Sequence, residues 1–244
     1  MDGDEHPHGE AKKRRRPTPQ ELAEGLVTLL DVEEIDVDLY RGPRNPGGRG
    51  RVFGGQVIAQ ALMSAVGSVE PERVVHSLHA YFMRPGDEDF PIIYRVERDY
   101  DGGSFSNRRV IAMQRGKPIL NMTASFQRKE KGLEHQAEMP DVPAPDDLPS
   151  EAEIFQRYKD EIPEPLYKFL TRSRPIEIRP VEIWNPVNPD KRAPVRNLWI
   201  RASGSIGENQ LMHRAVLAFA SDMGLLSTCM QPHAGSRNNR AGPS

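Results

Sequence analysis

The sequence lacks the features that mark secreted and membrane-spanning proteins. Cys229 is the only cysteine among 244 residues, so no disulfide can form within the chain, which suits a reducing compartment. The apolar runs are a few residues long, far below the roughly 20 that a membrane-spanning helix needs. The chain opens without a signal-peptide pattern and ends in Gly-Pro-Ser rather than in a peroxisomal Ser-Lys-Leu signal. We therefore expect a soluble cytoplasmic protein without a membrane span.

An excess of charge of either sign is also missing. The 33 basic and 35 acidic residues give a net charge of −2, so neither nucleic acid nor an acidic membrane is expected as a partner. Residues 1–19 are rich in charged residues, histidine and proline, a composition typical of a disordered tail. The basic run 12–16 within this tail is either a nuclear address or anion-binding patch, or simply a solvated segment.

Residues 20–130 predict an α+β unit built on one buried helix. A short amphipathic helix is expected at 20–30, followed by a loop rich in glycine and proline at 41–50. Residues 53–69 are apolar on nearly every side of a helix, which indicates burial. Strand patterns separated by turn residues come next, as in an antiparallel meander. These strands are expected at 74–83, 91–100, 104–114 and 117–127.

The second half repeats this outline only in part. Residues 131–173 predict a linker with a proline-rich stretch and short helices, and residues 174–233 predict a second unit. The expected linker elements are an extended stretch at 139–150 and helices near 151–160 and 163–171; the second unit has strands at 174–184 and 195–206 and a long apolar helix at 208–226. Too few residues follow this helix for three more strands, and 234–244 have the composition of a disordered tail.

Eight segments of the chain resemble the type II acyl-coenzyme A (acyl-CoA) thioesterases, in family order from about residue 22 to about residue 233. They read FGGQVIAQAL, HSLHAYFMRPGD, GGSFSNRRV, GKPILNMTASFQ, EHQAEMPDVPAPDDLPSE, RPIEIRPVE, LWIRASG and AFASDMGLL. The resemblance implies a tandem (double) hotdog, in which each antiparallel sheet wraps around a long central helix, here with an incomplete second copy. It also implies hydrolysis of acyl-CoA to fatty acid and CoA, without a metal or another cofactor.

The resemblance also implies where the catalytic groups lie. The family uses an Asp, a Gln and a Ser or Thr to hold and activate a water, and the Asp corresponds to Asp222 in the segment ASDMGLL. The other two groups lie in strands after this helix, and the resemblance ends before them. Ser227 and Thr228 lie outside the family position. Two hypotheses therefore stand: an acyl-CoA thioesterase, or a catalytically impaired, truncated product that only binds acyl-CoA or a partner chain. Either is compatible with a homo-oligomer.

The start of the first buried helix is a candidate binding site for the thioester oxygen. Gly54, Gly55 and Gln56 lie where a helix offers unpaired N–H groups and the positive end of its dipole. The alternative is that the two glycines give space for a close backbone crossing. Gln56 can instead pack in a polar pocket.

Basic and histidine side chains supply the remaining candidates. Arg84 and Arg108 are candidate ligands for the CoA phosphates, as are Arg109 and Lys117, although each can equally face solvent. His76 and His79 are three apart in an expected strand and point to opposite faces, so they indicate core or interface residues and no metal pair. No motif around a helix histidine supports hydration of enoyl thioesters.

Overall fold

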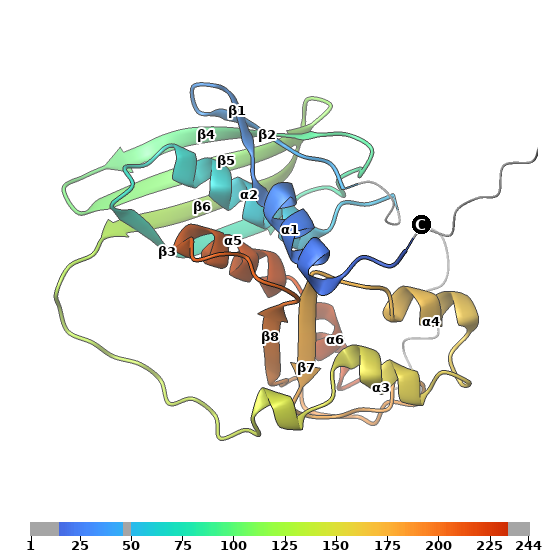
Figure 1. The fold of residues 1–244 in the computed structure, drawn as a ribbon. Helices are drawn as coiled ribbons and strands as arrows, with labels where there is room; N and C mark the ends of the chain where they lie inside the picture. The colour runs from blue at the N-terminus through green and yellow to red at the C-terminus, as the bar shows by residue number, and fades with distance from the viewer. Residues whose placement is uncertain (1–14, 46–49, 234–244) are drawn as a thin grey trace, which may run out of the picture.

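The computed structural model describes residues 15–45 and 50–233, which form a large curved sheet, helices in its hollow, and a smaller α/β body beside them (Figure 1). The tail predicted at 234–244 and most of the basic run 12–16 lie outside the described residues. Helix α1 spans Pro19–Leu30. Thr18 and Glu21 form a capping box at its start, so the helix begins where the charged segment ends.

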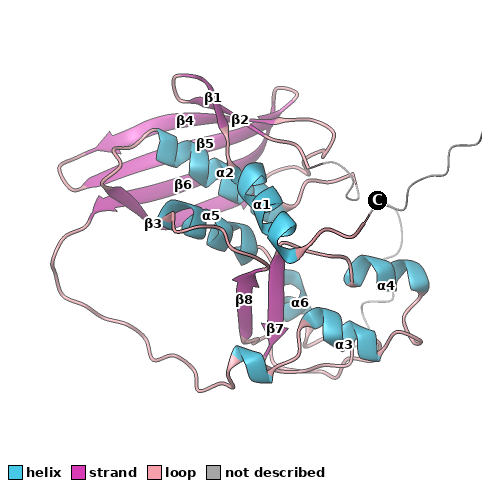
Figure 2. Ribbon diagram, viewed as in Figure 1, coloured by secondary structure: helices cyan, strands magenta, loops and turns pink. Residues whose placement is uncertain are grey.

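The predicted buried helix is α2, Gly54–Gly67, and ten of its 14 residues are buried. The strands of the large sheet are β1 (Glu33–Asp36), β2 (Leu39–Gly42), β3 (Arg73–Phe82), β4 (Ile92–Asp101), β5 (Phe105–Gln114) and β6 (Lys117–Arg128). Their order is β1-β2-β4-β5-β6-β3, and every neighbouring pair is antiparallel. Figure 2 shows the sheet curved around α2, as expected for a hotdog fold.

Two features of this sheet differ from the prediction. β1 and β2 are not predicted, because four-residue strands carry too little alternation to be recognised. The simple meander is wrong for β3, which pairs with β6 at the far edge and not with the following strand β4. The chain passes from β3 to β4 across the sheet, so only β4, β5 and β6 form a meander.

The second body is connected to the sheet by an extended segment that the proline-rich composition predicted (Figure 1). It contains the short 3-10 helix η1 (Pro145–Asp147), helices α3 (Glu151–Arg157), α4 (Glu164–Leu170), α5 (Gln210–Ser221) and α6 (Leu225–Met230), and strands β7 (Ile176–Pro180) and β8 (Leu198–Ala202). Strands β7 and β8 form an antiparallel two-stranded sheet.

The single helix predicted at 208–226 is wrong, because the chain breaks at Gly224. This glycine has φ = +86°, a left-handed conformation that ends α5 and redirects the chain into α6. α5 lies along α2 in the hollow of the large sheet (Figure 1), and its buried side chains belong to the same hydrophobic core as those of α2 and the sheet. The two halves of the chain therefore share one core. Among the described residues, no helix is long and apolar enough to cross a membrane.

Candidate active site

Asp222 lies at the end of α5, directly against the first turn of α2. It is the C-cap residue of α5, so its side chain leaves the helix end rather than the helix side. The N–H of Gly55 donates a hydrogen bond of 3.0 Å to Asp222 Oδ2. A carboxylate that accepts from the N-terminus of a helix also benefits from the positive end of the helix dipole. Residues 167 positions apart in the sequence thus form one polar contact.

The glycines at the start of α2 make this contact possible. A methyl group on Gly55 would lie 2.1 Å from the carbonyl oxygen of Phe219, and one on Gly54 would lie 2.7 Å from Asp222 Oδ2. Any larger residue would therefore push α5 away from α2. The rings of Phe53 and Phe219 pack edge to face beside this crossing, with centroids 5.0 Å apart. The geometry fits the second interpretation of the glycines, a close approach of backbones.

The surroundings of Asp222 raise the pKa of its carboxyl, which makes this group a better proton acceptor. Burial raises the pKa of this carboxyl above its ordinary value, and the hydrogen bond from Gly55 opposes the shift. A carboxylate with a raised pKa is a stronger base than one in water. Asp222 therefore has the properties of a general base or a water-orienting group.

A cavity of about 420 Å³ opens beside Asp222. Its size is within the range of ordinary small-molecule sites. Its wall is mainly apolar, and the lining residues are Val52, Gly54, Val57, Phe82, Met83, Arg84, Pro85, Gly86, Ile119 and Asp222. Asp222 and Arg84 carry the only polar side chains in this lining. The arrangement suits a ligand with an apolar chain and an anionic or polar end.

The predicted oxygen site at the start of α2 has fewer donors than expected. The Gly55 N–H is bound to Asp222, and the Gln56 N–H donates to the carbonyl oxygen of Phe53 at 3.1 Å. The N–H of Gly54 has no recorded acceptor within the described ranges. The Gln56 side chain is buried outside the cavity lining and donates to Pro43 O at 3.3 Å, which is the polar packing considered as its alternative role.

Arg84 belongs to the cavity, in the segment that follows β3. Its guanidinium donates to the carbonyl oxygen of Pro118 at 2.8 Å, and the side chain is otherwise exposed. The main-chain N–H groups of Met83 and Arg84 both bind Ile119 O, which fixes this segment to β6. An exposed cation so placed can meet a phosphate. Arg109 instead forms ion pairs with Glu97 and Asp99.

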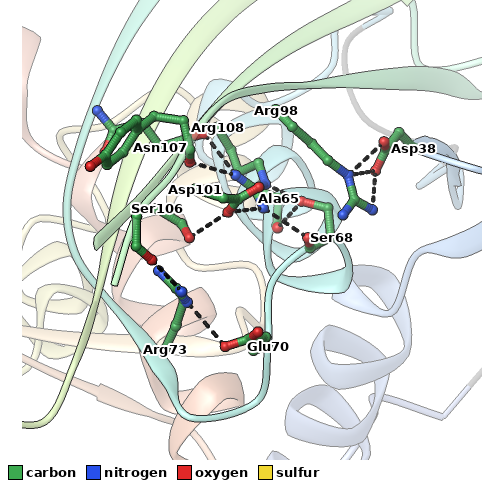
Figure 3. A network of polar contacts seen from close by, with 12 residues as sticks. Asp38, Ala65, Ser68, Glu70, Arg73, Arg98, Asp101, Ser106, Asn107 and Arg108 are labelled. Atoms are coloured by element: carbon green, nitrogen blue, oxygen red, sulfur yellow. Dashed lines mark hydrogen bonds and ion pairs between the residues drawn. The ribbon is translucent and has the colours of Figure 1, made fainter. Parts of the chain in front are cut away.

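Arg108 is not suited to its predicted role as a phosphate ligand. Its side chain is 1% exposed and lies beside Ser68 at the C-terminal end of α2 (Figure 3), whereas Asp222 binds the N-terminal end. Its guanidinium donates to Ser68 Oγ at 2.8 Å, to Ser68 O at 3.0 Å and to Asp101 Oδ1 at 2.8 Å. It also donates to the carbonyl oxygens of Tyr100 in β4 and of Asn107 in its own strand β5. All its donors are used to tie the C-terminus of α2 to the sheet, so none can reach a ligand.

Sequence reasoning did not single out the apolar residues of the cavity. Phe82 ends β3 and Met83 follows it, while Val52 and Ile119 come from other segments. Their types are those of ordinary core residues, and no short motif joins them. The turn residues Pro85 and Gly86 were a signal that the chain reverses here, but not that the reversal faces the start of α2.

Comparisons with known families support this fold. Residues 40–127 match the model of the acyl-CoA thioesterase N-terminal domain, and residues 167–241 match that of acyl-CoA thioesterase. The second match extends eight residues beyond residue 233, where the sequence resemblance was expected to end.

Several known proteins are similar over most of the chain. Acyl-CoA thioesterase 2 of Haemophilus influenzae is 39% identical over 213 residues, 87% of this chain and 74% of that protein. Human acyl-coenzyme A thioesterase 8 is 40% identical over 228 residues, 90% of this chain and 72% of that protein. The crystal structure of an acyl-CoA thioesterase II from Mycobacterium marinum superimposes with a TM-score of 0.67 at 33% identity, covering 88% of this chain and 73% of that one. The chain therefore belongs to the type II (TesB-like) acyl-CoA thioesterase family.

Proposed function

We propose that this protein hydrolyses acyl-CoA thioesters to a free fatty acid and CoA, with Asp222 as the catalytic carboxylate. The observation that carries the proposal is a half-buried carboxylate, bound by the first turn of α2, on the wall of an apolar cavity. Family membership supplies the reaction class, and the relatives that are similar over most of the chain are named as acyl-CoA thioesterases.

The proposed reaction needs no cofactor. A water held by Asp222 attacks the thioester carbonyl carbon and gives its proton to the carboxylate, and the carbonyl oxygen becomes an oxyanion. The C–S bond then breaks as the oxyanion reforms the carbonyl. The proton passes from Asp222 to the departing CoA thiolate, so the carboxylate is regenerated. The N–H of Gly54 is the available donor for the oxyanion at the start of α2.

Arg84 is the proposed contact for a phosphate of CoA. It is the only cation in the cavity lining and lies on the exposed side of the segment after β3. A guanidinium binds phosphate oxygens through two parallel N–H groups, and such charge-assisted bonds are about twice as strong as neutral ones. In this arrangement, the acyl chain occupies the apolar wall formed by Val52, Val57 and Ile119.

We propose a division into two domains joined by a linker, and two separate family matches, at 40–127 and 167–241, support two units. The first hotdog domain is placed at 20–130, the linker at 131–173 and the partial second domain at 174–233. The first contains a six-stranded sheet and α2, while the second contributes the two strands β7 and β8 and helix α5. Asp222 comes from the second domain and its binding partner Gly55 from the first, so the proposed site requires both.

The second candidate function is binding of acyl-CoA, or of a partner chain, by a catalytically impaired product. The observation that favours it is the composition of the cavity. Within the part of the chain that the structure describes, the lining contains no Ser, Thr or Gln side chain to assist Asp222. Losing an essential polar group from a concerted site commonly costs about 10²- to 10⁴-fold in rate.

A single assay separates the two functions. The purified chain is incubated with palmitoyl-CoA, and released CoA is measured with a thiol reagent while binding is measured by calorimetry. Multiple turnovers support the enzyme, whereas saturable binding without thiol release supports the impaired binder. If the chain neither binds palmitoyl-CoA nor releases CoA from it, both the thioesterase and the acyl-CoA binder are contradicted.

A further inference from the structure

Phe82 is the aromatic side chain of the cavity lining, and it lies near the proposed catalytic carboxylate. A methyl group placed on Gly54 would lie 2.7 Å from Phe82 Cζ and 2.7 Å from Asp222 Oδ2. Phe82 Cζ and Asp222 Oδ2 both lie next to the same point beside Gly54. The distance between these two atoms is therefore at most twice 2.7 Å. Both side chains line the same cavity.

The backbone holds Phe82 at this point independently of Asp222. Phe82 is the last residue of β3 and pairs with Leu120 of β6, and the next two N–H groups bind Ile119 O. The side chain is 52% exposed, so it contributes little to the core. A large aromatic ring that is fixed by the strand, lies outside the core and touches the start of α2 needs an explanation other than packing.

The ring cannot donate a hydrogen bond to a carboxylate, and it occupies space that water would otherwise fill. On that side Asp222 loses hydration without gaining a partner, which disfavours its charged form. Among the described residues, burial and the Gly55 N–H are the influences on the Asp222 pKa, and no cation forms an ion pair with this carboxylate that would offset the lost hydration. Arg84 after β3 donates to Pro118 O, and Arg196 behind the Gly224 turn forms an ion pair with Glu151.

We propose that Phe82 is a positioning residue for thioester hydrolysis, which shields Asp222 from bulk water and forms the wall that places the acyl chain beside it. The inference rests on the proposed function. Phe82 itself transfers no proton and forms no bond. Its ring holds the carboxylate in a water-poor setting beside the cavity.

The experiment compares four forms of the full chain: wild type, Phe82→Ala, Phe82→Leu and Tyr81→Ala. Leucine keeps an apolar wall without the ring. Tyr81 is a matched control because it is the neighbouring residue of β3, 67% exposed and outside the cavity lining. The titration of the Asp222 carboxyl is followed by carbon NMR, and kcat and KM for palmitoyl-CoA are measured in parallel.

We expect Phe82→Ala to lower the pKa of Asp222 toward its ordinary value and to lower kcat about 10- to 100-fold, the scale of a misplaced reacting group. Phe82→Leu should restore most of both, and Tyr81→Ala should match wild type. An Asp222 pKa in Phe82→Ala equal to that of wild type would overturn the proposal, as would an unchanged kcat. If wild type itself releases no CoA, the proposed function fails, and the NMR titration alone still decides whether Phe82 shields Asp222.

Discussion

At the scale of single residues, two opposing influences act on the pKa of Asp222. Burial raises its pKa, and the N–H of Gly55 lowers it, with burial the larger effect. In an unfolded chain neither effect operates. The folded protein thus binds the Asp222 proton more tightly than the unfolded chain, and the charged form of this residue costs stability.

This cost predicts how stability changes with pH. Because the folded pKa lies above the unfolded value of 3.8, the contribution of Asp222 to stability falls as pH rises through the window between them. Asp222→Asn has no charge and can still accept the Gly55 N–H. We expect the variant to have a higher free energy of unfolding in urea than wild type at pH 7, with the difference shrinking toward pH 4. If Asp222→Asn is less stable than wild type at pH 7, the charged form of Asp222 does not cost stability, and this account of its pKa is contradicted.

Arg84 and Arg108, both predicted as ligands of the CoA phosphates, should behave differently when substituted. Arg84→Gln should raise KM for palmitoyl-CoA about tenfold, as expected for the loss of roughly 1.4 kcal/mol of binding, with an unchanged melting temperature.

Arg108→Lys should leave KM unchanged and lower the free energy of unfolding by roughly 1.5–3 kcal/mol, because lysine cannot make the forked bonds to Ser68 and Asp101. Steady-state kinetics and urea unfolding check both. An increased KM in Arg108→Lys would show that Arg108 contributes to CoA binding and would contradict its purely structural role.

At the scale of elements, the crossing of α2 and α5 fixes the site, and glycine permits it. Gly55→Ala would place a methyl group 2.1 Å from Phe219 O, which requires the two helices to separate. We expect a loss of about 1–3 kcal/mol in stability. Gly25→Ala is the matched control in α1, where nothing lies within 4 Å of the added methyl, and it should stabilise the protein by about 0.5–1 kcal/mol. Equal effects of the two substitutions, measured by thermal unfolding, would contradict the close crossing.

The elements also show what the sequence could predict. Helix α2 and strands β3 to β6 follow from apolar patterns and turn residues that are local in the sequence. The position of β3 beside β6 does not, because strand pairing depends on the sheet closing around α2. The break at Gly224 is visible as a glycine, but its left-handed conformation depends on how the chain turns between α5 and α6.

The candidate site divides in the same way. Asp222 could be predicted because it belongs to a short segment, ASDMGLL, that resembles the family motif containing the catalytic Asp. Arg108 is buried and poorly suited to its predicted role, and a strand arginine followed by another arginine, Arg109, gives no sign of which one points inward. Phe82 carries no sequence signal, since its role depends on the meeting of the end of β3 with the start of α2.

At the scale of the whole molecule, both halves of the chain contribute to one core. Residues of α1, α2, the large sheet, β7 and α5 belong to a single buried cluster. Trp184 and Trp199 are the only two tryptophans, and both lie in the second half. Tryptophan fluorescence therefore reports on the second half, whereas circular dichroism reports on the whole chain.

This shared core predicts cooperative unfolding. The midpoints of urea unfolding measured by fluorescence and by far-ultraviolet circular dichroism should coincide, as expected for a single transition. A fluorescence transition at clearly lower urea would show that 174–233 unfolds alone. In that case Asp222 would leave Gly55 before the first domain unfolds, and the proposed division into two cooperating domains would be wrong.

The most direct test of the central claim is kcat/KM for palmitoyl-CoA hydrolysis by Asp222→Asn, relative to wild type at the same pH. Ser221→Ala is the control, since its hydroxyl binds Ala218 O and it lies outside the cavity lining. If Asp222 accepts the proton of the attacking water, Asp222→Asn should lose about 10²- to 10⁴-fold in kcat/KM while Ser221→Ala keeps wild-type activity. A folded Asp222→Asn variant with the kcat/KM of wild type would contradict the assignment of Asp222 as the catalytic carboxylate.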